Sequence, residues 1–223
     1  MDELHTAQDP QAFTAELDAV LRAALERLRE AKPSAGPQAS VKDLLFLALK
    51  AEIEAVEEAA MWLAGERDHE LKLALARQCG DEARHYRLVA ERLGELGADL
   101  SSFDPLAGGH SAMFRYLKTL EGSAERIAAG PFAREALAVV RNQAFADYCE
   151  ARGDLATAKL YREVIGPDEA FHHDLGRRML LKFARTAEDQ ERARRAVART
   201  LQIAEEIQEI ARLKQGISHA PGC

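Results

Sequence analysis

Two stretches of this sequence carry the same short motif, Asp-Glu-Ala-x-His. The first is CGDEARHY, which contains Glu82 and His85, and the second is PDEAFHHD, which contains Glu169 and His172. Residues three positions apart lie on the same face of an α-helix, so each pair can direct a carboxylate oxygen and an imidazole nitrogen toward one point. Such mixed donors suit divalent first-row metal ions. Each motif is therefore a candidate half of a metal site.

Both motifs fall on helix faces that the surrounding sequence predicts to be buried. With about 100° of rotation per residue, Glu82 and His85 share a face with Leu75 and Val89. Burying carboxylates without compensation costs too much free energy to be tolerated. Either some of these carboxylates are protonated, or positive charge lies between them, and a pair of divalent cations would supply that charge.

Two further glutamates are expected on the buried stripes of neighbouring helices. Glu52 lies at the centre of one apolar stripe, whereas Glu54, Glu57 and Glu58 are predicted to face solvent. Glu135 shares the stripe of a later helix. Glu52 and Glu82 both lie roughly 20 Å from the turn that joins their helices, at about 1.5 Å per residue. Glu135 and Glu169 likewise lie at about one level of the second hairpin. Glu52 and Glu135 are therefore candidates to complete the site.

Several other residues compete for these roles. Asp147 and Glu150 are alternatives to Glu135, and His173 is an alternative to its neighbour His172 or a residue lining the site. The third Glu-x-x-His of the chain begins at Glu66, but it lies at a helix turn far from the other acids. A lone motif of this kind arises easily by chance, so we interpret it as a surface feature.

The elements that position these residues are expected to be helices. Ala, Leu, Glu and Arg dominate the composition and strand-forming residues are sparse, which favours an all-α protein. Breaks at KPSAGPQAS, at a short turn after Ala64 and at Gly97 separate the helices. Helices are predicted over 12–31, 40–64, 68–96, 131–151, 154–186 and 188–214.

Three expectations concern the less regular parts of the chain. Residues 98–130 form a long connection with a weakly helical piece at 113–129, and Gly130-Pro131 is expected to begin the next helix. Gly166-Pro167 should kink the helix that contains it. The tail GISHAPGC is expected to be loose.

This pattern predicts a four-helix bundle with one long crossover, formed by residues 40–186. Residues 1–39 would form an N-terminal flanking helix and linker, and residues 187–223 a C-terminal helix and tail. The final helix, with its arginine-rich ARRAVART segment, is interpreted as a solvated or dimerising element, and a homodimer is one expected assembly.

With these residues in place, the sequence resembles the ferritin-like di-iron carboxylate superfamily, in its oxygen-activating monooxygenase and tRNA-hydroxylase-like branch. The resemblance covers about residues 40–184 and implies a ferritin-like bundle. It implies that one iron is held by Glu52, Glu82 and His85. The second iron would be held by Glu135, Glu169 and His172, and manganese could replace iron.

The same resemblance assigns further roles. Glu82 and Glu169 would bridge the two ions and take part in catalysis. Asp168 would bond His85, and Asp81 would bond His172, so that each aspartate orients the histidine of the other motif.

The function implied by this resemblance is an oxygen-dependent oxidase or hydroxylase of a small molecule. Its reactants would be dioxygen or peroxide, with electrons from an external donor, because the three cysteines form no Cys-x-x-Cys pair for a built-in rubredoxin site. Four alternatives are iron oxidation and storage as in ferritins, a rubrerythrin-like peroxidase, a manganese catalase and a tRNA-modifying hydroxylase.

Composition limits the partners and the compartment. The formal net charge of −7 argues against nucleic acid, which needs a basic surface. No apolar run approaches the length of a membrane-spanning helix, so no membrane association is expected. The acidic N-terminus does not read as a signal peptide, and the odd number of cysteines favours a reducing compartment. A cytoplasmic location is therefore expected.

Overall fold

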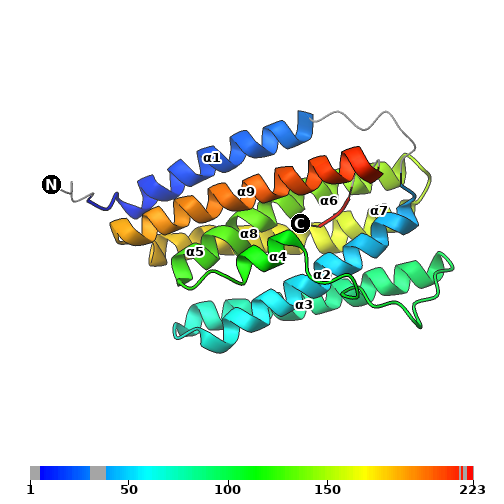
Figure 1. Cartoon of the computed structure of the whole chain (residues 1–223), viewed down its shortest axis with the longest axis horizontal. Helices are drawn as coiled ribbons and strands as arrows, with labels where there is room; N and C mark the ends of the chain where they lie inside the picture. Colours follow the sequence, from blue (N-terminus) through cyan, green and yellow to red (C-terminus); the bar gives the residue numbers. More distant parts are fainter. Residues whose placement is uncertain (1–5, 31–38, 216, 218–219, 223) are drawn as a thin grey trace.

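The computed structural model describes residues 6–30, 39–215, 217 and 220–222. Every regular element within these residues is helical, and no strand occurs among them, so the predicted all-α class is confirmed. The long helices run roughly along one common direction (Figure 1). Within the described part of the chain, no helix combines the length and the apolar character that crossing a membrane requires.

The order of the elements matches the expected helices closely, with additional short segments. The long helices are α1 (Pro10–Glu30), α2 (Val41–Gly65), α3 (His69–Glu95), α6 (Glu135–Glu150), α8 (Gly166–Phe183) and α9 (Ala187–Gln215). Shorter α-helical and π-helical segments are α4 (Ala112–Leu117), α5 (Ser123–Ile127), η1 (Ala128–Arg134), α7 (Leu155–Leu160) and η2 (Tyr161–Ile165).

The hairpin of α2 and α3 is bounded by the capping residues that the sequence indicates. Ser40 accepts a hydrogen bond from the backbone N–H of Asp43, whose carboxylate accepts one from the Ser40 backbone in return. Asp68 accepts from the backbone N–H of Leu71 at the start of α3. Gly97 follows the end of α3 with φ 73°, a conformation that glycine adopts without steric cost.

Gly130-Pro131 does not begin a helix, contrary to prediction. α5 continues through the π-helical η1 into α6, and Pro131 lies inside η1. The glycine is needed for close packing: a Cβ atom at Gly130 would lie 2.5 Å from Glu58 Oε1 and 2.7 Å from the Trp62 ring. The Gly-Pro pair is therefore a site of close helix approach within one continuous helical run.

The second Gly-Pro pair follows another π-helical segment. η2 joins α7 to α8, and Pro167 lies in the first turn of α8, where its missing N–H is tolerated. Where the sequence predicted a kink at Gly166-Pro167, the structure has a π-helical turn directly before this pair. Such turns often occur at functional sites.

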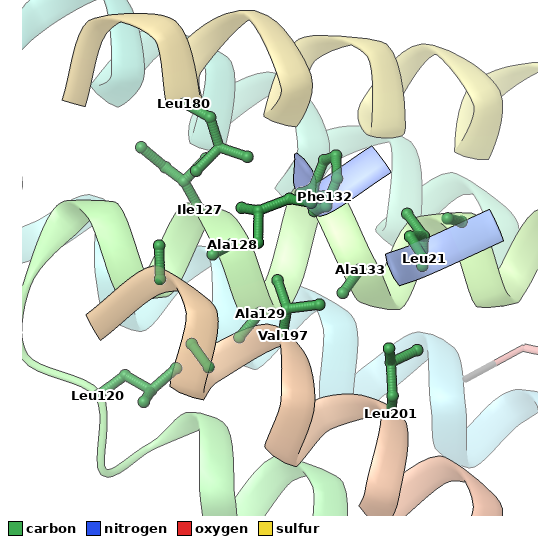
Figure 2. Packing of buried hydrophobic residues seen from close by; sticks show 14 of the residues in the cluster. Leu21, Leu120, Ile127, Ala128, Ala129, Phe132, Ala133, Leu180, Val197 and Leu201 are labelled. Carbon is green, nitrogen blue, oxygen red and sulfur yellow. The ribbon is translucent and has the colours of Figure 1, made fainter. Parts of the chain in front are cut away.

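α1 and α9 belong to the hydrophobic core. Figure 2 shows Leu21 of α1 and Val197 and Leu201 of α9 facing the same apolar interior as Phe132 and Leu180. One face of α9 is buried within this chain along most of the length of the helix, so the expectation of a solvated or dimerising element is wrong for that face. The periodicity of small apolar residues between the arginines allows this packing. Its buried residues include Ala193, Ala196, Val197, Thr200, Leu201 and Ala204.

The interior contains two apolar cores with polar residues between them. The first core includes Trp62 of α2, Leu75 of α3 and Leu180 of α8. The second includes Leu49 of α2 and Val89 of α3, which lie farther from the turn of the same hairpin. The buried residues that lie between the cores include Glu52 on α2 and Glu82 and His85 on α3, which the sequence singled out.

The described residues of the C-terminal tail are packed against the protein, which corrects the expectation of a loose tail. Pro221 and Gly222 are buried. The backbone N–H of Gly222 donates to Asn142 Oδ1 at 2.8 Å, and a Cβ atom at Gly222 would lie 2.9 Å from the Cβ of Ala51. A backbone hydrogen bond to a buried side chain holds this part of the tail, an arrangement that composition alone does not reveal.

Candidate metal centre

Six buried side chains from four helices converge between the two apolar cores. They form the carboxylate–histidine cluster, whose members are Glu52 from α2, Glu82 and His85 from α3, Glu135 from α6, and Glu169 and His172 from α8. Each is at most 4% exposed. These are the six residues proposed from the sequence, and the structure brings all of them together.

The cluster divides into two overlapping ligand sets. One atom from each of Glu52, Glu82, His85 and Glu169 lies within 4.8 Å of the others, and the same holds for Glu82, Glu135, Glu169 and His172. Glu82 and Glu169 belong to both sets. This arrangement can hold two cations side by side, with the two shared glutamates between them.

Both histidines direct Nδ1 into the cluster. Nδ1 of His85 lies 3.3 Å from Glu82 Oε2, 3.6 Å from Glu52 Oε2 and 3.8 Å from Glu169 Oε1. Nδ1 of His172 lies 3.3 Å from Glu169 Oε2 and 3.6 Å from Glu82 Oε1. The two Glu-x-x-His motifs thus present nearly equivalent donor sets from opposite sides.

The other imidazole nitrogen of each histidine faces an aspartate of the opposite motif. Nε2 of His85 lies 3.0 Å from Asp168 Oδ2, and Nε2 of His172 lies 3.1 Å from Asp81 Oδ2. These are the contacts that the resemblance implied. An ionised carboxylate only accepts hydrogen bonds, so each Nε2 donates its proton and each Nδ1 can offer a lone pair to a metal ion.

Glu135 is held at one oxygen by two donors. A guanidinium nitrogen of Arg134 and Nε2 of Gln78 each donate to Glu135 Oε1 at 2.7 Å, which leaves Oε2 to face an ion. Because η1 runs directly into α6, Glu135 lies within a continuous helical run. The alternatives Asp147 and Glu150 instead accept hydrogen bonds from Arg162, and the side chains of both acids are more than half exposed.

Two other histidines considered in the sequence, the alternative His173 and the surface candidate His69, also lie outside the cluster. His173 Nδ1 lies 2.7 Å from the backbone oxygen of Phe132, so His173 does not replace His172. His69 is exposed, in agreement with the surface interpretation. Its partner Glu66 is nevertheless buried and accepts from the backbone N–H groups of Arg67 and Asp68; the surface interpretation is wrong for this residue because its carboxylate caps the turn.

Glu54 and Glu58 are buried, contrary to the prediction that they face solvent. Glu54 accepts from the backbone N–H of Ser111 at 2.7 Å, at the start of α4. Glu58 Oε2 lies 2.8 Å from the Arg134 guanidinium. The helical wheel of α2 misses both contacts, because α4 and η1 cover faces of α2 beyond the one that points at the cluster.

Arg134, Glu58 and Gln78 are therefore neighbours of the cluster that sequence reasoning missed. Arg134 contacts Glu58 and Glu135 and lies 4.0 Å from Glu82 Oε1. The adjacency of Arg134 to Glu135 is visible in the sequence. Successive helical residues point about 100° apart, however, so nothing local indicates that both reach one buried network.

The buried carboxylates of the cluster need positive charge close to them in order to ionise. Without a cation, burial raises the pKa of Glu52 to about 7 and of Glu58 to about 7, and it raises that of Glu169 well above its ordinary value. Burial opposes charge on His85, but hydrogen bonds with Glu52 and Glu82 raise its pKa to about 11. A proton on His85 thus supplies positive charge within the cluster.

The pKa of Glu82 moves in the opposite direction. Burial again favours the neutral acid, but the hydrogen bond from His85 and the charge of Arg134 lower its pKa to about 2. Glu82 therefore stays ionised at the centre of the cluster. Four ionised cluster glutamates would carry four negative charges, which two divalent cations balance, while Glu58 and Arg134 balance each other.

The residues fit a pair of divalent metal ions. Glu82 Oε1 is fully buried and has no hydrogen-bond partner among the described residues, as expected of an oxygen that faces an ion. Four carboxylates and two imidazoles suit iron or manganese.

Comparisons with protein-family models, with curated proteins and with solved structures found no match for this chain, so the assignment of the centre rests on its own residues.

Proposed function

We propose that this chain is a ferritin-like di-iron carboxylate protein, able to hold manganese in place of iron, that oxidises or hydroxylates a small molecule with dioxygen. The observation that carries the proposal is the pair of overlapping ligand sets that share Glu82 and Glu169. In the proposed centre, Glu52 and His85 complete one set, and Glu135 and His172 complete the other.

The metal pair supplies redox chemistry that protein side chains lack, namely the activation of dioxygen for the oxidation of a bound substrate. The chain would position this chemistry. Asp168 and Asp81 keep the proton of each imidazole on Nε2, so Nδ1 stays available. Arg134 and Gln78 hold Glu135 at a single oxygen.

The chain would also shield the centre. The apolar cores on either side of the cluster contain large buried residues such as Phe132 and Tyr161, which exclude water and strengthen electrostatic interactions within the site. Electrons would come from an external donor, as the cysteine pattern predicts.

Metal analysis tests the first half of the proposal. Protein purified without chelator should contain two iron or manganese ions per chain. Glu82→Gln and Glu169→Gln should each weaken the binding of both ions, because both ligand sets share these residues, whereas His85→Ala should weaken mainly one. Glu57→Gln is the matched control on α2, since the Glu57 side chain is 40% exposed. Metal content unaffected by the double variant E82Q/E169Q would overturn the proposal.

Oxygen uptake tests the second half. Reduced, iron-loaded protein should consume dioxygen repeatedly when an electron donor and a substrate are present. Uptake limited to a single oxidation of the bound iron would refute the oxidase and leave iron handling. Rapid disproportionation of peroxide by manganese-loaded protein would favour a catalase instead.

A further inference from the structure

The C-terminal tail reaches the carboxylate–histidine cluster. A small cavity at the cluster is lined by its four glutamates, by Arg134, by three alanines and by Gly222 of the tail. Figure 1 shows that the described end of the tail lies back over the middle of the bundle and not beyond the end of α9. Gly222 therefore forms part of the wall of the space that adjoins the proposed ligands.

With the tail in place, this cavity is too small for a substrate. Its volume is about 10 Å³, which is about the space that a single buried water molecule needs. Dioxygen and any organic substrate are larger than water. The six side chains of the cluster are themselves at most 4% exposed. A solute larger than water therefore reaches the carboxylates on this side of the cluster only after the tail has moved.

Gly222 fits closely into this position. Its φ of 74° lies in the left-handed region, which glycine adopts without steric cost. A Cβ atom at Gly222 would lie 2.9 Å from the Cβ of Ala51, the residue that precedes Glu52 on α2. Because residue 222 carries no side chain, the tail can lie directly against the helix that supplies Glu52.

Asn142 of α6 holds the tail at this place. Its side chain is buried, and its Oδ1 accepts a hydrogen bond from the backbone N–H of Gly222 at 2.8 Å. Its Nδ2 has no hydrogen-bond partner among the described residues, and a buried polar group without a partner costs free energy. An apolar residue would avoid that cost, so we interpret the hydrogen bond to the tail as the role of Asn142.

The contacts that hold the tail are small, which favours reversible opening. Ala220 is half-buried and packs with Ile217 against the second apolar core, and Gly222 contributes no side chain. Chain termini open locally at a lower free energy than helices that are packed into a core. Opening of the tail therefore leaves the four helices that carry the cluster in place.

We infer that residues 220–222 form a lid over the proposed metal centre, which we call the tail lid. In the closed position, Gly222 covers the small cavity at the cluster. In the open position, the four carboxylates become accessible to a metal ion, to dioxygen or to a substrate. The inference rests on the proposed function for the identity of the centre, but the closure itself requires no metal.

Thiol labelling in the presence of EDTA tests the tail lid without metal. Ala138→Cys places a thiol in the wall of the small cavity, at a position that is 1% exposed. Methyl methanethiosulfonate is larger than water and modifies this thiol only when the cavity is open. Peptide mass spectrometry follows the modification at residue 138. Adding Gly222→Ala should raise its rate at least about tenfold, because a strained φ and the contact with Ala51 destabilise the closed position.

Two controls separate opening of the lid from general loosening of the protein. Gly97→Ala introduces the same backbone strain at φ 73°, with nothing within 4 Å of the added Cβ atom, and should leave the rate at residue 138 unchanged. Cys79 is a half-buried native thiol on α3 outside the small cavity, and G222A should not change its rate of modification. An unchanged rate at residue 138 in G222A, or an equal rise at Cys79, would overturn the inference.

A further variant tests the contact between the tail and α2. Ala51→Gly removes the Cβ atom that a side chain at residue 222 would meet. In an A51G background, G222A should therefore raise the labelling rate by a smaller factor than it does when Ala51 is present. Equal factors in the two backgrounds would contradict the proposed contact.

Manganese exchange tests the link to the centre. A lid controls the rate of passage without changing the ligands, so G222A should speed manganese uptake and manganese release to EDTA by a similar factor and leave Kd unchanged. Faster release alone, with a raised Kd, would indicate damage to the site and would contradict the lid. A protein that binds no manganese would refute the proposed function, and the labelling experiment would still decide whether the tail closes the cavity.

Discussion

Nε2 of His85 lies 3.0 Å from Oδ2 of Asp168, so the imidazole of the first motif is oriented by the second motif. The same relationship runs in the opposite direction between His172 and Asp81 at 3.1 Å. Two sequence repeats, far apart along the chain, therefore depend on each other for the orientation of their proposed ligands. These two reciprocal histidine–aspartate contacts also link α3 to α8 directly beside the cluster.

The first prediction concerns the contact between His85 and Asp168. Asp168→Asn should lower the manganese affinity of the site containing His85 by about 10–100-fold, because the charged carboxylate that orients the metal-bound histidine is replaced by a neutral amide. Titration calorimetry measures the effect. Asp174→Asn, an exposed change on the same helix, is the control. Since Arg84 also contacts Asp168, Arg84→Gln should be compared; an equal loss in R84Q would indicate a general effect of charge.

The second prediction concerns Arg134. Arg134→Gln would leave Glu58 and Glu135 buried without the guanidinium that contacts both. Removing one partner of a buried ion pair costs about 3–5 kcal/mol, so urea unfolding should show a loss of this order in metal-depleted protein. Adding Glu58→Gln should recover part of it. A double variant no more stable than R134Q would show that the pair with Glu58 does not account for the loss.

The third prediction concerns pH. In metal-depleted protein, Glu52 and Glu58, with pKa values of about 7, keep protons that the unfolded chain releases above about pH 4.5. Stability should therefore fall as the pH rises from about 4.5 to 7. His85, with a pKa of about 11, has the same sign, because its stabilising proton is lost as the pH rises toward 11.

Unfolding free energies in EDTA should thus be lower at pH 8 than at pH 5, by an amount on the order of 1–3 kcal/mol. Saturating manganese should remove the fall, since bound cations compensate the ionised carboxylates. The variant E52Q/E58Q should show a weaker dependence on pH. A rise in stability between pH 5 and 8 in EDTA would contradict the electrostatic account.

The fourth prediction concerns Gly130. A methyl group at this position would meet Glu58 Oε1 at 2.5 Å and the Trp62 ring at 2.7 Å. Gly130→Ala should therefore cost about 1–3 kcal/mol, the usual range for overpacking. Gly80→Ala is the matched control within α3, where nothing lies within 4 Å of the added atom. It should be neutral or stabilise the protein by up to about 1 kcal/mol. Equal thermal stability of the two variants would refute this role of Gly130.

Sequence reasoning succeeded where the relevant information is local. Helical periodicity alone placed Glu82 and His85 on one buried face, and the chemistry of Ser40 and Asp68 marked two helix starts. Glu52 and Glu135 were predicted as members of the site because each lies on the buried stripe of its helix, at the same level as a motif on the adjoining helix. These inferences hold because the geometry of a helix relates residues a few positions apart in the same way in every protein.

The surroundings of the cluster depend on contacts between distant segments, and there the sequence was insufficient. Glu58 is buried because η1 brings Arg134 to it, Gly130 is needed because Trp62 lies against it, and the tail is held because Asn142 accepts a hydrogen bond from Gly222. Periodicity states which residues share a face of one helix. It does not state which segment covers that face, because packing free energy is determined by all the helices together.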